Sequence, residues 1–181
     1  DQLPQKDKNK LIAERPQAEM SATNALQNIE RLGNIAKELH DHPGLSGITG
    51  KINQYSALDV TPETRAARGL QSTMVKQIGL QALQAMRDAS KTGGAVGQVT
   101  EREWPILQQS IAALDDAQAT GDYQKALTNL QDQIKSSGER VRKAYEQTYG
   151  TLKYDPVPYT PQGRNTAEGK IGWDAAKEKR Y

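Results

Sequence analysis

Apolar side chains recur every three or four residues over most of the chain up to residue 149, the spacing that places them on one face of an α-helix. The first stripe starts at about Gln17 and contains Met20, Leu26, Ile29, Leu32, Ile35 or Ala36, and Leu39. We expect this helix to end near Asp41, because His42 precedes Pro43 and the residue before a proline disfavours helical angles. Three glycines between residues 44 and 50 then predict a loop.

A second helix is predicted from Pro62 to about Ala89. Thr61 supplies a capping hydroxyl, and proline is favourable at the first helical position. The apolar stripe contains Ala67, Leu70, Met74, Ile78, Ala82 and Ala85 or Met86, with Val75 and Leu83 widening it. Gly69 and Gly79 each cost ~1 kcal/mol relative to alanine inside a helix, so we expect a neighbouring backbone to approach closely at both.

A glycine-rich link follows, in which Gly93, Gly94 and Gly97 allow backbone angles that a Cβ would exclude. Thr100 and Glu103 have the spacing of a reciprocal capping box. The third helix is therefore predicted to begin after Thr100, with Pro105 near its start and with Ile106, Leu107, Ile111 and Leu114 as its stripe. The glycines lack a following Lys-Ser or Lys-Thr and a preceding strand, which excludes a phosphate-binding loop.

A fourth helix, capped by Asp122, is predicted from Tyr123 to about Tyr149. Its stripe contains Leu127, Leu130, Ile134, Val141 and Tyr145. Ser137 occupies a position where this pattern calls for an apolar residue, and Gly138 follows it. We expect both residues to weaken the middle of the contact.

The two ends of the chain lack this periodicity. Residues 1–16 are polar and contain two prolines, so they are predicted to form an N-terminal arm. After Gly150, prolines at every second or third position predict an extended segment over residues 154–161. The fold expected is all-α: a hairpin-rich bundle of four helices over residues 17–149, between an extended arm at 1–16 and an extended tail at 150–181.

The composition predicts a thin core. Only 35% of the residues are hydrophobic, phenylalanine is absent, and the mean hydropathy is −0.80. The C-terminal tail has too little apolar surface to order by itself. We therefore expect its larger side chains to dock on another copy or another kind of subunit; they are Tyr154, Tyr159, Ile171 and Trp173. Trp104 either covers the end of the hairpin or anchors an interface.

The charges do not demand a nucleic-acid partner. The formal net charge is +2, and the densest basic group, at Arg140, Arg142 and Lys143, is offset by Glu139 and Glu146. Zero cysteines exclude a disulfide framework and a thiolate site, and no apolar run approaches the ~20 residues of a membrane-spanning helix. The chain begins at Asp1, so an N-terminal piece was removed or further residues precede it.

Two groups of residues invite a chemical interpretation. His40 and His42 are two apart, so on a helix they point to different sides, which favours a helix-end role over a metal site. Glu101 and Glu103 have the residue types of an acid–base pair for sugar cleavage, but the capping box explains them better. We therefore expect no catalytic residue, no metal and no cofactor.

The segment Thr-Gly-Gly-Ala-x-Gly-x-Val-Thr-Glu-x-Glu, residues 92–103, carries a resemblance. Together with Leu107, Ile111, Leu114 and Asp115, it resembles a recurrent unit of tailed-bacteriophage virion proteins. Residues 42–47 and the helix ending at residues 80–87 are similar to the same group, and the resemblance covers residues 25–149. It implies a structural component of the phage particle, without enzymatic activity, near the portal, the tail or the DNA-ejection apparatus. Such a protein would be made in the bacterial host cytoplasm and reside in the virion, as a homo-oligomer that contacts other virion proteins.

Two other functions remain open. One is a nucleic-acid-binding virion module that contacts the genome through Lys and Arg of the last helix. The other is a helical domain of a peptidoglycan-degrading virion protein, in which Glu101 and Glu103 would be the reacting groups.

Overall fold

The structure is a computed structural model, and it describes residues 4–49, 61–92, 94–116 and 119–154. Every regular element in these ranges is helical, which confirms the all-α prediction. The elements are α1 (Gln5–His40), α2 (Leu45–Ile48), α4 (Pro62–Thr73), the π-helical stretch η1 (Met74–Gly79), α5 (Leu80–Ser90), α6 (Gly94–Asp116) and α7 (Thr120–Tyr149).

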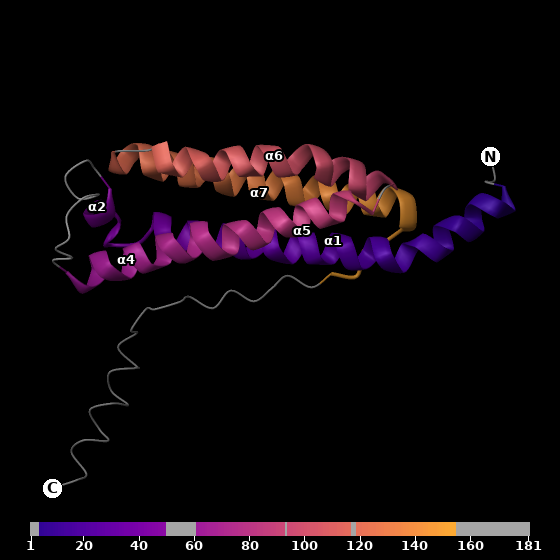
Figure 1. Cartoon of the computed structure of the whole chain (residues 1–181), viewed down its shortest axis with the longest axis horizontal. Coiled ribbons are helices and arrows are strands. Elements are labelled where there is room, and N and C mark those ends of the chain that lie inside the picture. The colour runs from indigo at the N-terminus through magenta and orange to yellow at the C-terminus, as the bar shows by residue number, and fades with distance from the viewer. Residues whose placement is uncertain (1–3, 50–60, 93, 117–118, 155–181) are drawn as a thin grey trace, which may run out of the picture.

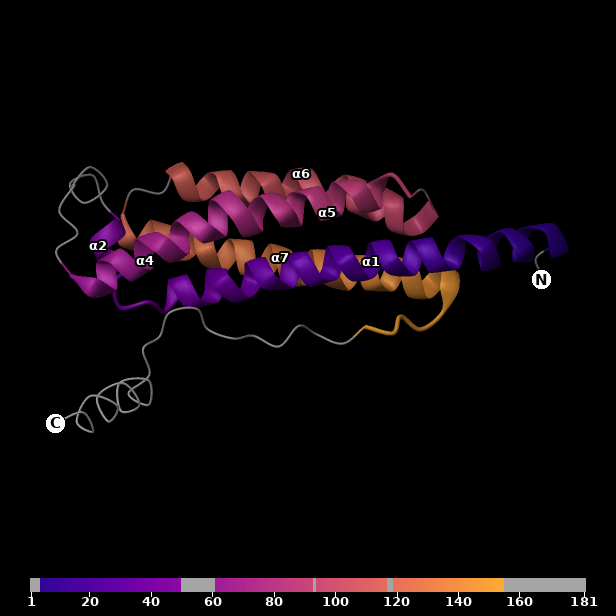
Figure 2. The same ribbon diagram turned by 60° about the horizontal axis from the view of Figure 1, so that its bottom comes forward.

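The long helices lie side by side in an elongated rod (Figure 1). α1 packs along α7, α7 along α6, α6 along α5, and α5 along α1, so the contacts form a closed circuit. Successive long segments run in opposite directions, as both Figure 1 and Figure 2 show. Among the described helices, each is too short or too polar to cross a membrane.

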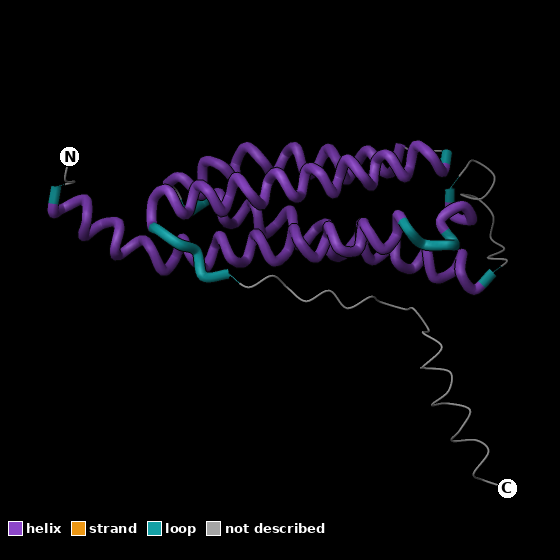
Figure 3. Tube along the Cα trace, turned by 180° about the vertical axis from the view of Figure 1, so that it is seen from behind, coloured by secondary structure: helices purple, strands orange, loops and turns teal. Residues whose placement is uncertain are grey.

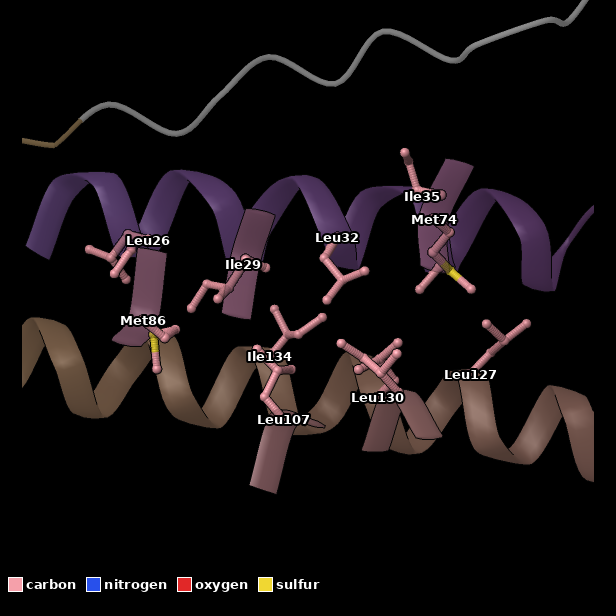
Figure 4. Close-up of a cluster of buried hydrophobic side chains, with 14 of the residues drawn as sticks. Leu26, Ile29, Leu32, Ile35, Met74, Met86, Leu107, Leu127, Leu130 and Ile134 are labelled. Atoms are coloured by element: carbon pink, nitrogen blue, oxygen red, sulfur yellow. The ribbon is translucent and has the colours of Figure 1, made fainter. Parts of the chain in front are cut away.

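The core lies along the middle of the rod and contains most of the residues of the predicted stripes. Leu26, Ile29 and Leu32 of α1 face Leu130 and Ile134 of α7 (Figure 4). All five are at most 6% exposed. Burial of one such side chain stabilises the fold by roughly 1.5–3 kcal/mol relative to an exposed position. Helices with narrow apolar stripes therefore obtain their stability mainly from packing on one another.

Helix α1 begins much earlier than the sequence predicted. Residues 5–16 are helical and continuous with the rest of α1, with Pro16 inside the helix, so the expectation of an extended N-terminal arm is wrong for these residues. Most of them are good helix formers, and Asp7 lies in the first turn, where the helix dipole favours a negative charge. These preferences outweigh the missing amide of Pro16. The first turns of α1 project past the ends of the other helices (Figures 1 and 2).

The second predicted helix is present but is not uniform. The Oγ1 atom of Thr61 accepts a hydrogen bond from the Thr64 amide at 3.1 Å, which confirms the cap. The π-helical stretch η1, which ends at Gly79, was not predicted. A Cβ on Gly79 would lie 3.0 Å from the Met74 carbonyl oxygen of the same helical segment and 3.5 Å from Cδ1 of Ile111, so the close neighbour from another helix is a side chain and not the predicted backbone. The same expectation is wrong for Gly69, where a Cβ would meet no atom within 4 Å.

The starts of the last two helices also differ from the predictions. α6 begins at Gly94 rather than after Thr100, which places Pro105 in its middle and leaves Ile106 43% exposed. α7 begins at Thr120, and Asp122 lies in its first turn rather than at the cap. Met20 of α1, predicted to be in the stripe, is 61% exposed.

Candidate functional site

The turn between α5 and α6 contains the glycines that the sequence singled out. Gly94 has a φ of +62°, in the left-handed region that glycine adopts without strain. A Cβ on Gly97 would lie 2.9 Å from the Ser90 carbonyl oxygen, so this position also requires glycine. Gly93 lies outside the described residues. Glycine at positions 94 and 97 thus allows α6 to start directly against the end of α5.

The predicted capping box of Thr100 and Glu103 is wrong. The Thr100 hydroxyl donates hydrogen bonds to the carbonyl oxygens of Val96 and Gly97, at 2.9 and 3.1 Å, inside the helix. Since α6 starts six residues before Thr100, the amides near Thr100 already have partners within the helix. The glycine-rich segment was interpreted as a loop, whereas part of it forms the first turns of α6.

Glu103 instead joins α6 to α7 through a cluster of polar contacts. Its Oε1 accepts a hydrogen bond from Nε of Arg140, and its Oε2 accepts one from Nη2 of Arg140, both at 2.7 Å. Oε2 also accepts hydrogen bonds from Oγ of Ser137 at 2.7 Å and from Nε2 of Gln133 at 3.1 Å. Ser137 is fully buried and its hydroxyl has a partner in Glu103, so the polar interruption of the α7 stripe is satisfied, and a weakening of the contact there stays a prediction. Sequence reasoning missed this arrangement, although residues 133, 137 and 140 share one face of α7.

The cluster favours an ionised carboxylate. Burial by itself would raise the pKa of Glu103, but the hydrogen bonds from Arg140, Ser137 and Gln133, with the positive charge of Arg140, hold the pKa below its usual value. Glu103 in turn raises the pKa of Arg140 through its hydrogen bonds. A group held ionised is a poor proton donor at neutral pH. Glu101 is exposed whereas Glu103 is buried, so the two carboxylates lie in different environments.

Trp104 is partly buried and packs against the core. The guanidinium carbon of Arg87 lies 5.8 Å from the centre of its ring, within the range of a cation–π interaction. This contact connects α5 with α6, and covering the end of the hairpin stays a prediction. The role of Trp104 as an interface anchor also stays a prediction.

The residues after α7 turn back onto their own chain. Gly150 has a φ of +87°, and Leu152 is buried. The hydroxyl of Tyr154 donates a hydrogen bond to the Glu30 carboxylate, and the guanidinium carbon of Arg142 lies 5.7 Å from the centre of the Tyr154 ring. Tyr154 thus makes contacts within its own chain, and its docking on a second molecule stays a prediction. Figure 3 shows this loop turning back beside α1. Tyr159, Ile171 and Trp173 lie outside the described residues.

A groove of about 560 Å³ runs between α1 and α7. Its lining includes the apolar side chains of Leu26, Ile29 and Ile134, together with two glycines, Gly33 and Gly138. Polar and charged residues on both helices line the rest, and they are Glu30, Asn34, Lys37, Gln131, Asp132, Lys135, Glu139 and Arg142. The two residues that hold Tyr154, Glu30 and Arg142, are therefore also part of this groove. Sequence reasoning missed the groove, although a glycine on each of the two helices was a usable signal.

The N-terminal half of α1 offers a second surface. Every residue from 5 to 17 is at least partly exposed, and Ile12 is 70% exposed. Met20, just beyond this stretch, is also largely exposed.

The two histidines are at the end of α1, as expected. Nδ1 of His40 lies 2.7 Å from Oδ1 of Asp41, and Nδ1 of His42 accepts a hydrogen bond from the Gly44 amide at 3.0 Å. Over the described ranges, no three His, Asp or Glu side chains come close enough together to hold a metal ion.

Comparisons with known proteins identified no relative of this chain. No protein-family model, no curated protein and no solved structure matches the chain.

Proposed function

We propose that this chain is a non-enzymatic structural subunit of a phage particle, near the portal, the tail or the ejection apparatus, and that it docks to neighbouring subunits through its two ends. The neighbours are further copies of the chain and other virion proteins, and the protein resides in the virion. The observation that carries the docking role is the projecting half of α1, where Ile12 is 70% exposed, together with Met20, which is exposed just beyond it. The assignment to a phage particle rests on the resemblance of residues 92–103.

The physical basis is the difference between a helix with and without neighbours. An isolated helix of fewer than ~12–15 residues is marginal in water, and the projecting part of α1 is about that long. Contact with another subunit would bury Ile12 and Met20, and each buried side chain of this kind adds roughly 1.5–3 kcal/mol. A contact repeated by each copy would generate a symmetric oligomer.

The nucleic-acid alternative has less support from the described residues. Arg140 is held by Glu103, and Arg142 lies over the ring of Tyr154. Two of the three basic residues in the densest group of α7 thus have partners within the chain. If DNA were the partner, retention on DNA would weaken steeply as the salt concentration rises.

The test is the mass of the full chain in solution, measured by light scattering over a range of concentrations, alone and with candidate virion proteins. We expect a mass above that of one chain, or a complex with a virion protein. The double variant Ile12→Asp, Met20→Asp should reduce it, whereas the control Ala13→Asp, at a small exposed position of the same helix, should reduce it less. A monomer under all of these conditions would overturn the proposed function.

A further inference from the structure

We propose that two copies of the chain pair through an antiparallel contact between their α1 helices, with Pro16 of each copy at a two-fold axis. This pairing rests on the docking role proposed above for the projecting half of α1, and it names the partner of that surface as α1 of a second copy. It follows from an uncharged strip on α1, from the spacing of that strip, and from the charges beside it.

The uncharged strip lies on one face of α1. Its residues recur at intervals of three or four, and each is at least partly exposed: Asn9, Ile12, Pro16, Met20 and Thr23. None of them is charged, although 25% of the whole chain is charged. Ile12 is 70% exposed and Met20 is 61% exposed. Charged residues are depleted and methionine is enriched at the centres of protein–protein interfaces, so the strip has the composition of a contact face.

The strip borders a groove of about 770 Å³ where α1 joins the rod. Pro16, Met20 and Thr23 line this groove, together with Asp88 of α5. Among the described residues of its lining, Glu19 and Asp88 are acidic and none is basic. Asp88 also contacts Lys91, but its side chain remains 50% exposed. The groove can therefore accept a positively charged partner.

The projecting turns of α1 have the charge that this groove accepts. Residues 5–15 contain four basic residues and only two acidic ones, which are Lys6, Lys8, Lys10 and Arg15 against Asp7 and Glu14. Because α1 is one continuous helix, these turns point away from the groove of their own chain (Figures 1 and 2). The same turns of a second copy can lie along it. Charge complementarity of this kind fixes the orientation of two partners.

The spacing of the strip fixes the antiparallel register. Its intervals are three, four, four and three residues, so it reads the same in both directions from Pro16. In an antiparallel pair centred there, residues equally far from Pro16 lie opposite each other. Ile12 of one copy then faces Met20 of the second copy, and Asn9 faces Thr23 of the second copy. The two-fold axis repeats both contacts, as a self-complementary interface requires.

Single cysteines test the register, because the chain has none of its own. Under mild oxidation, Pro16→Cys should give a covalent dimer, since the two thiols meet at the axis. Ile12→Cys alone, or Met20→Cys alone, places its two thiols about 12 Å apart along the helices, and a disulfide needs Cα atoms within ~7 Å. An equal mixture of these two variants should therefore cross-link at least about tenfold faster than either variant alone. Equal rates for the mixture and the single variants would overturn the antiparallel register, and rapid cross-linking of Met20→Cys alone would indicate a parallel pair instead.

A pair of charged variants tests the same contact without oxidation. Ile12→Lys, Met20→Asp places opposite charges across the interface, whereas Ile12→Asp, Met20→Asp places like charges there. We expect the first variant to self-associate at least about fivefold more tightly than the second at low salt, measured by light scattering. The two positions are about 12 Å apart within one copy, so the gain must arise between copies. Circular dichroism checks that both variants remain helical, and equal dissociation constants would overturn the pairing.

The outcomes separate this pairing from the proposed function. Association with further copies or with virion proteins, without preferential cross-linking in the mixture, would overturn the pairing and leave the docking role intact. A complex with virion proteins and no self-association would assign the strip to a different partner. A monomer under all of these conditions would overturn both.

Discussion

The two halves of α1 form one continuous helix of 36 residues, yet they are stabilised in different ways. From Ala18 to Leu39, ten residues are buried against other helices. From residue 5 to residue 17, all of the residues are at least partly exposed, and the helix relies on its own hydrogen bonds and on local pairs such as Lys10 with Glu14 at 3.9 Å. The comparison shows that helical conformation and contribution to the core are separate properties in this chain.

The two halves of α1 also differ in role: one half stabilises the fold, and the other half offers a surface for association. In the packed half, apolar residues face α7 and α5 and hold the rod together. In the projecting half, an apolar residue such as Ile12 has no buried environment in its own chain. Substitutions should therefore change the free energy of unfolding in the packed half, and the association with partners in the projecting half.

The largest effect should come from truncating a core side chain of α1. Leu32→Ala removes a fully buried side chain and should lower the free energy of unfolding by about 2–5 kcal/mol. The matched change Ile12→Ala, in the projecting half of the same helix, should alter it by less than about 0.5 kcal/mol. Urea unfolding followed by circular dichroism measures both. Similar losses for the two variants would mean that the halves do not differ as described.

A smaller effect should come from adding a methyl group where two helices meet closely. Gly97→Ala would place a Cβ 2.9 Å from the Ser90 carbonyl oxygen, and should destabilise the fold by about 1–3 kcal/mol. Gly69→Ala, at an open position inside α4, should instead stabilise it by up to about 1 kcal/mol, the difference in helix propensity. Thermal unfolding measures both changes in stability. If the two changes have opposite signs, the contrast between packed and open positions holds for the other helices as well. Equal signs would contradict it.

The smallest effect should come from the polar contact between α6 and α7. Glu103→Gln removes the charge that Arg140 contacts and should cost about 1–2 kcal/mol at pH 7, whereas the exposed Glu101→Gln should have little effect. Since folding lowers the pKa of Glu103, its contribution is fully present above its unfolded pKa of about 4.3 and is lost as the pH falls through the folded value. The difference between parent and Glu103→Gln in urea unfolding should therefore be larger at pH 7 than near pH 3. A difference independent of pH would show that the charge of Glu103 is not involved.

The apolar stripes could be predicted because periodicity is a local property. Leu26, Ile29, Leu127, Leu130 and Ile134 were identified from their spacing, and all are buried. The start of α6 could not be predicted in the same way. Thr100 and Glu103 have the spacing of a cap, but the same two residues also fit the interior of a helix. The structure distinguishes the two interpretations, through the hydrogen bonds of Thr100 to the Val96 and Gly97 carbonyls and the contact of Glu103 with Arg140, 37 positions away in the chain. The π-helical stretch before Gly79 likewise gives no periodic signal in the sequence.

The sequence by itself determined that the described part of this protein is all-α, and it identified most of the large apolar core residues of α1 and α7, because spacing decides which side chains share a helix face. It also determined the end of α1 and the cap at Thr61, which depend on neighbouring residues alone. Only the tertiary structure decided that Glu103 joins α6 to α7, that Tyr154 lies on Glu30, and that a groove remains between α1 and α7. These features depend on residues that are distant in the chain and near in space, so no local pattern contains them.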